Sequence, residues 1–186
     1  MGVVKGGEAL AVNSDENIDQ AALRKWIEAG LAIPEVRELN GDAGYLLNNM
    51  IAKYTLASSF YAISERALAE LYARGVDLSV TYSRRAFYGK QNGENPFIYE
   101  HAVPVGVVRR ELLGHAADPQ RIKKTLASSG RVAVLLRVED QEIRSAGLAS
   151  RMPDSWKFGH DPLARYQAVG TRLSTKVLHV TGAICR

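Results

Sequence analysis

Apolar residues in the first half of the chain recur three and four positions apart, which is the spacing of one face of an α-helix. The first such run follows Ser14 and Asp15, either of which can cap a helix, and Gly30 lies just past its end. This pattern predicts one amphipathic helix near the N-terminus, preceded by a glycine-containing arm over residues 1–14.

A longer helical pattern covers residues 42–74, with a break between two helices at Ser64-Glu65 and a stop at Gly75. Within it, the stretch 45–63 carries Lys53 as its only charge, but its many polar residues would be costly in hydrocarbon. We therefore expect buried helices here and no membrane segment.

The second half changes from a helical to a strand-like pattern. Residues 78–88 and 96–103 are rich in β-branched and aromatic side chains, and the link 89–95 is composed of turn residues, which together predict a β-hairpin. The continuous apolar run 132–136 is typical of a strand buried on both faces, and we expect it to be the central strand. A last strand is predicted over 177–184.

Short helices are predicted between these strands. Pro104 can occupy the first turn of a helix that ends at Gly114. An Asp-Pro pair followed by a glycine occurs twice, over 118–130 and 161–170, and predicts a helix with an aspartate cap and a left-handed glycine at its end. The acidic stretch that begins at Glu139 predicts another helix, which ends at Gly147.

The combined pattern predicts an α+β protein, with a helical N-terminal half followed by a small mixed sheet that short helices flank. We divide the chain into a flexible arm (1–14), an acidic helical part (15–77) and a basic α/β part (78–186). At 186 residues the two parts are expected to form one compact domain.

The composition is that of an ordinary globular protein, with 46% hydrophobic and 24% charged residues. The single cysteine, Cys185, excludes an internal disulfide and favours a reducing compartment. Residues 1–7 contain no apolar run of the kind that a signal peptide needs. We therefore expect a cytoplasmic protein.

Charge is distributed unevenly along the chain. Residues 1–78 contain 7 Lys and Arg against 11 Asp and Glu, a net charge of −4, whereas residues 79–186 contain 17 against 9, a net charge of +8. Clustered cations bind polyanions because they release condensed counterions when they meet phosphates. The basic part is therefore predicted to bind nucleic acid.

The cations of the basic part occur in local groups, and aromatic residues lie near the first of them. Aromatic rings beside arginine can stack on unpaired bases while the cations hold phosphates. The predicted nucleic-acid-binding residues are Arg84, Arg85, Lys90, Arg109, Arg110, Lys123 and Lys124.

Glu100 and His101 lie at the predicted junction of a strand and a helix, and His101 begins a His-x-x-Pro segment that ends at Pro104. A histidine in that place can act as a general base or metal ligand, and a neighbouring carboxylate can orient it. The segment resembles the His-x-x-Pro entry of the HNH, or ββα-metal, nucleases. Together with the basic part, this junction motivates the hypothesis of a metal-dependent nuclease, with Glu100 and His101 as candidate catalytic residues and a divalent metal such as Mg²⁺ as cofactor.

The sequence also departs from that family, because the residues that follow Pro104 lack the further Asn and His ligands. In addition, neighbouring side chains of one strand point to opposite faces, so Glu100 and His101 need a bulge to face one site. The alternative interpretation is a partly buried His101 and a Glu100 that pairs with a neighbouring arginine.

A second grouping places His160 beside Asp161, close to Trp156, with Arg165 one helical turn further on. Here we interpret Asp161 as a helix cap and Arg165 as a solvated or ion-paired side chain.

Two hypotheses of function follow. The first is an intracellular nucleic-acid-binding protein, with metal-dependent cleavage as its extension. The second is a non-enzymatic interaction or inhibitor protein that uses segment 42–74 as a dimer or partner surface. A small-molecule enzyme would need a polar pocket, which the sequence does not reveal. The sequence does not distinguish DNA from RNA.

Overall fold

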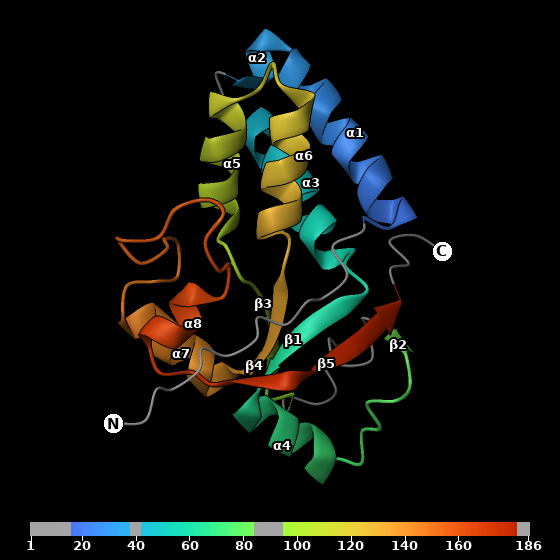
Figure 1. Cartoon of the computed structure of the whole chain (residues 1–186), viewed down its shortest axis with the longest axis vertical. Helices are drawn as coiled ribbons and strands as arrows, with labels where there is room; N and C mark the ends of the chain where they lie inside the picture. Colours follow the sequence, from blue (N-terminus) through green and yellow to red (C-terminus); the bar gives the residue numbers. More distant parts are fainter. Residues whose placement is uncertain (1–15, 38–41, 84–94, 182–186) are drawn as a thin grey trace, which may run out of the picture.

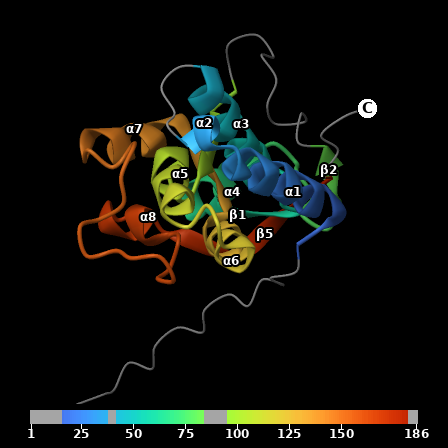
Figure 2. The ribbon, with the colours of Figure 1, turned by 90° about the horizontal axis from the view of Figure 1, so that it is seen from above.

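The computed structural model of the chain describes residues 16–37, 42–83 and 95–181. Figure 1 shows a group of helices at one end and a sheet at the other. The helical group consists of α1 (Ile18–Ala32), α2 (Pro34–Arg37), α3 (Asp42–Leu56), α5 (Val105–Gly114) and α6 (Pro119–Ser129). Seen from above in Figure 2, these helices stand over the sheet, with α7 (Arg137–Ser145) and α8 (Ala164–Ala168) to one side.

The sheet has five strands in the order β2-β5-β1-β4-β3. Strand β1 pairs in parallel with β4 and antiparallel with β5, β3 pairs antiparallel with β4, and the short β2 pairs in parallel with β5. The mixed sheet and the flanking helices confirm the predicted α+β class. The strands are β1 (Phe60–Ser64), β2 (Tyr82–Ser83), β3 (Phe97–His101), β4 (Val132–Leu136) and β5 (Leu173–Thr181).

The predicted hairpin between 78–88 and 96–103 is wrong, because β2 and β3 occupy opposite edges of the sheet. Both segments contain strand residues, but β2 pairs with β5 and β3 pairs with β4. The link 89–95 was expected to form the turn, and its residues 89–94 lie outside the described ranges. Local composition identified strand-forming stretches here, whereas pairing with distant strands decided their positions.

The central strand is also different from the one expected. The run 132–136 does form a strand, β4, and its first four residues are buried. The middle of the sheet is instead β1, which lies in the segment 42–74 that was predicted to be entirely helical. Phe60–Ser64 is a continuous run of aromatic, apolar and small residues, and pairing on both sides makes it a strand.

Ser64 ends β1 and caps α4 (Glu65–Ala73), since its hydroxyl accepts a hydrogen bond from the Ala67 N–H at 3.0 Å. A boundary therefore lies at Ser64-Glu65 as predicted, but it separates a strand from a helix and not two helices. Gly75 follows with a φ of 73°, a left-handed conformation that favours glycine. The predicted stop at Gly75 is therefore confirmed.

The core has three connected parts. The helices pack on one another through buried residues such as Ile27, Ile51 and Leu112. One face of the sheet packs against α4, and the other packs against α7 and α8. None of the described helices combines the length and apolar character that crossing a membrane would require.

Several helix ends differ from the predicted ones. Helix α1 is capped by Asn17, continues past Gly30, and leaves Trp26 70% exposed, so Trp26 is not a core position. Asp118 caps α6 as expected, but Gly130 has a φ of −75° and is not left-handed. Asp161 does not cap a helix, because α8 begins after Leu163.

Candidate functional site

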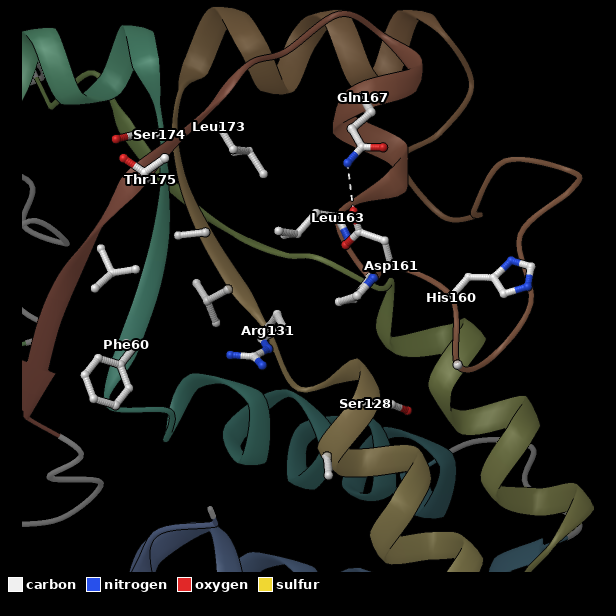
Figure 3. Close-up of a pocket in the computed structure, with 16 residues that line it drawn as sticks. Phe60, Ser128, Arg131, His160, Asp161, Leu163, Gln167, Leu173, Ser174 and Thr175 are labelled. Atoms are coloured by element: carbon white, nitrogen blue, oxygen red, sulfur yellow. Dashed lines mark hydrogen bonds between the residues drawn. The ribbon is translucent and has the colours of Figure 1, made fainter. Parts of the chain in front are cut away.

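A pocket of about 630 Å³ opens between the sheet, the C-terminal end of α6, and α8 with the loop before it (Figure 3). Its floor is mainly apolar because three strands of the sheet supply it. The residues of this floor are Phe60 and Ala62 of β1, Val132 of β4, and Leu173 and Val177 of β5. This volume and lining are typical of a site for a small organic group.

Arg131 supplies a cation to this pocket from the link between α6 and β4. Its backbone is fixed on both sides, since its N–H donates to the Ser129 carbonyl and its carbonyl accepts from the Ala102 N–H, each at 2.8 Å. Within the described ranges, however, its guanidinium forms no hydrogen bond and no ion pair. Burial lowers the pKa of this guanidinium, and the negative charge of Asp161 partly offsets the effect. A half-buried, unpaired cation is suited to an anionic ligand.

Asp161 faces the pocket from the loop before α8, and Figure 3 shows it projecting toward the same hollow as Arg131. One carboxylate oxygen accepts a hydrogen bond from the Gln167 amide at 2.7 Å, and the other accepts from the Leu163 N–H at 2.9 Å. The Trp156 indole donates to the Asp161 carbonyl at 2.8 Å. These bonds fix the carboxylate as an acceptor at the pocket wall.

His160, by contrast, lies at the outer edge of the pocket, where its Nδ1 accepts from the Lys157 N–H at 3.3 Å. The predicted grouping of His160 and Asp161 is thus adjacent in the structure, but the His160 ring points outward, away from Arg131 (Figure 3). This arrangement gives the pocket a cation and a carboxylate on separate walls.

Lys123 and Lys124 are exposed on α6, and within the part of the chain that the structure describes neither forms an ion pair or a side-chain hydrogen bond. Ala127 and Ser128, one helical turn further on, line the pocket. The two lysines therefore lie directly before its rim. We refer to Lys123, Lys124 and Arg131 together as the α6 cations.

The remaining predicted nucleic-acid-binding residues are less well placed. Arg109 and Arg110 lie on the neighbouring helix α5, where Arg110 is exposed and the buried Nε of Arg109 has no hydrogen-bond partner in the described ranges. Arg84, Arg85 and Lys90 lie outside those ranges. Lys123 and Lys124 lie one helical turn before the lining residues Ala127 and Ser128, but within the described ranges none of the predicted nucleic-acid-binding residues lines the pocket.

Glu100 and His101 occupy the edge strand β3, and their side chains lie in different surroundings. The Glu100 carboxylate lies 3.2 Å from the guanidinium of Arg165, which is only 1% exposed. Burial raises the pKa of Glu100, against the opposing effect of the Arg165 charge. This is the ion pair that the alternative interpretation of Glu100 predicted.

His101 lies near α3, where its Nε2 is 3.4 Å from the Ala52 carbonyl oxygen. Burial is the main cause that lowers the pKa of this imidazole, so the neutral ring is favoured. Neither His101 nor Glu100 lines the pocket. Among the residues described, no three His, Cys, Asp or Glu side chains form a group that could hold a metal ion. Catalytic roles for Glu100 and His101 therefore stay predictions.

Arg131 is the main residue of the site that sequence reasoning missed. One signal was present, because Arg131 is a cation placed between a helix-ending glycine and the apolar run of β4. Such a residue lies where a strand of the sheet begins, and it is therefore close to any hollow at that end of the sheet. The floor residues from β1 could not be found without recognising that strand.

The chain was compared with protein-family models, with curated proteins and with solved structures, and none of the three comparisons gave a match.

Proposed function

We propose that this protein binds nucleic acid through the α6 cations. The observation that carries the proposal is that Lys123 and Lys124 on α6 and Arg131 directly after it form no ion pair in the described ranges, and that Arg131 lines a pocket with apolar walls. Cations bind the phosphates of a strand, and an apolar wall offers a surface to its bases. The charge of the basic part, +8 over residues 79–186, has the same sign.

Three arginines elsewhere on the molecule are paired with carboxylates. Arg24 pairs with Glu28 at 2.6 Å, Arg74 with Glu70 at 2.6 Å, and Arg144 with Asp140 at 2.7 Å. In each of these pairs the carboxylate neutralises the arginine, which weakens its attraction for a phosphate. Lys123 and Lys124 have no such partner in the described ranges, so no carboxylate competes there with a phosphate.

The test is binding of labelled single-stranded and double-stranded DNA and RNA over a range of salt concentrations. Wild-type protein is expected to bind with an affinity that falls as salt rises. The double variant Lys123→Gln/Lys124→Gln is expected to bind more weakly and to reduce the slope of log affinity against log salt by about 1 to 2.

The matched control is Lys25→Gln/Lys53→Gln, which removes the same charge from exposed positions on α1 and α3. It is expected to leave the salt slope within experimental error of wild type. Absence of binding at low salt, or an equal effect of the two double variants, would overturn the proposal. Cleavage of the nucleic acid stays a further expectation. Repeating the assay with Mg²⁺ or Mn²⁺, for wild type and for His101→Gln, tests it.

A second candidate function is self-association through the acidic helical part, which three exposed side chains favour. Trp26 on α1 is 70% exposed, and Tyr45 and Leu46 on α3 are 68% and 59% exposed. Sedimentation velocity of wild type and Leu46→Glu tests this, with Val138→Glu on α7 as the control for an exposed apolar residue. A concentration-dependent dimer that only Leu46→Glu dissociates would support it, and a monomer at all concentrations would contradict it.

A further inference from the structure

We propose that the pocket beside α6 binds one nucleotide unit, with its base against the apolar floor and its phosphate on Arg131. The inference takes its ligand class from the proposed function and deepens it, because it specifies an unpaired nucleotide. The same chemistry is offered by a free nucleotide and by one residue of a single strand. The experiments below distinguish these two sources.

The size and lining of the pocket favour a base and its sugar. A volume of about 630 Å³ lies within the range of roughly 300–1,000 Å³ that small organic ligands occupy in proteins. Phe60, Leu173 and Val177 offer apolar contact to the face of a ring. A base inside a duplex is stacked on both faces and paired at its edge, so only an unpaired base can enter. The pocket therefore favours single strands.

Arg131 determines where the phosphate lies. Its guanidinium is planar and can donate two parallel hydrogen bonds to a phosphate, and charge-assisted bonds of this kind are among the strongest in proteins. The cation is half-buried, and within the described residues nothing pairs with it. A bound phosphate would supply the missing partner.

Asp161 determines where the base edge lies. Its carboxylate repels a phosphate, so the phosphate belongs on the Arg131 side and the base on the Asp161 side. Each carboxylate oxygen of Asp161 accepts one hydrogen bond in the structure and has a further lone pair. An acceptor wall of this kind pairs with an exocyclic amino group, which cytosine carries and uracil lacks. Cytosine is therefore expected to bind more tightly than uracil.

The two lysines extend the site along α6. Lys124 precedes Ser128 on the pocket rim by four residues, which is about one turn and about 6 Å along the helix. A phosphate next to the bound nucleotide would therefore meet Lys124 or Lys123. A single strand should gain affinity from these lysines, whereas a free mononucleotide should gain little.

The first experiment is calorimetric titration of the full chain with cytidine monophosphate, uridine monophosphate, cytidine and inorganic phosphate. Cytidine monophosphate is expected to bind more tightly than the other three. Arg131→Gln is expected to weaken the affinity for cytidine monophosphate by about tenfold to a hundredfold, because it removes a hydrogen bond between charged groups. Asp161→Asn is expected to reduce the preference for cytidine over uridine monophosphate.

A second variant keeps the test independent of any effect of Arg131 on folding. Thr175→Tyr places a ring at an exposed position of the pocket lining on β5, so it should obstruct the pocket while circular dichroism stays unchanged. It is expected to weaken the binding of cytidine monophosphate at least as much as Arg131→Gln does. Inorganic phosphate binding as tightly as cytidine monophosphate would overturn the base contact.

Short single strands of cytosine and the matching duplex complete the test. Single strands that bind more tightly than the mononucleotide, and that lose this gain in Lys123→Gln/Lys124→Gln, would identify a strand as the ligand. Mononucleotide binding without strand binding would retain the pocket site and contradict the proposed function. Strand binding that depends on the lysines but is unchanged in Arg131→Gln and Thr175→Tyr would overturn the pocket inference alone.

Discussion

The guanidinium of Arg165 lies 3.2 Å from the carboxylate of Glu100, and this ion pair joins α8 to strand β3 inside the protein. The same guanidinium donates to the carbonyl of His101 and, at 3.0 Å, to the carbonyl of Leu148. One buried cation thus connects three segments of the chain, which are β3, the loop after α7, and α8. Because α8 and the loop before it carry Asp161, this ion pair also supports one wall of the pocket.

Replacing Arg165 with Met is expected to destabilise the protein strongly. The change leaves the Glu100 carboxylate, whose side chain is 15% exposed, without its cation, and breaking a buried pair in this way costs about 3–5 kcal/mol. The free energy of unfolding in urea measures the effect. The control is Arg66→Met, which breaks a pair with Glu142 whose side chains are 51% and 44% exposed and which should cost about 1 kcal/mol or less. Equal losses in the two variants would contradict a special role for Arg165.

His101 is expected to make stability depend on pH. Burial lowers its pKa in the folded protein below the ordinary value of 6.5, so the unfolded chain binds the proton more readily. The neutral His101 ring therefore contributes its full stabilisation of the fold above pH 6.5. This stabilisation is lost as the pH falls through the lowered pKa of the folded state. Urea unfolding of wild type and His101→Gln at several pH values measures this. The variant should lose the part of the pH dependence that lies in this window, and an unchanged pH dependence would contradict the argument.

The sequence predicted those elements whose side-chain pattern has one structural solution. The run 132–136 is too short for a helix and apolar throughout, so it could only be a buried strand, and it is β4. β1 was missed because Phe60 continues the three- and four-residue spacing of the preceding helix. Only the strands β4 and β5 on either side of it decide its conformation, and they lie far along the chain.

In the candidate site, too, the sequence revealed local features but not contacts between distant segments. Lys123 and Lys124 were identified because a charge cluster is visible in the sequence alone. Arg131 and Asp161 were not paired with them, since their proximity depends on how the loop before α8 packs on the sheet. The buried state of Arg165 was also unpredictable from its neighbours, because its partner Glu100 lies on another element.

The buried contact between Ser64 and Glu139 is expected to stabilise two helices at once. The Ser64 hydroxyl donates to the Glu139 carboxylate at 2.6 Å, and the same carboxylate oxygen accepts from the Leu136 N–H at 2.8 Å. Ser64→Ala should therefore cost about 1–3 kcal/mol, since it removes the α4 cap and leaves a buried carboxylate with fewer donors.

The matched control for this contact is Glu142→Gln, which weakens an exposed pair between α7 and α4. The Arg66 and Glu142 side chains are 51% and 44% exposed, so the change should cost less than about 1 kcal/mol. Unfolding free energies of the two variants give the comparison. A loss in Ser64→Ala no larger than that in Glu142→Gln would show that the buried contact contributes nothing beyond a surface pair.

Two glycine-to-alanine changes are expected to alter stability in opposite directions. At Gly130 an added Cβ would lie 2.7 Å from the Leu126 carbonyl oxygen and 3.0 Å from the Tyr54 ring, although the φ of −75° suits alanine. Crowding alone should then destabilise by about 1–3 kcal/mol. At Gly30, inside α1, nothing lies within 4 Å of the added atom, and alanine should stabilise by up to about 1 kcal/mol because it has the higher helix propensity. Thermal and urea unfolding of both variants measure the difference, and a stabilised Gly130→Ala would contradict the close approach of α6 to Tyr54.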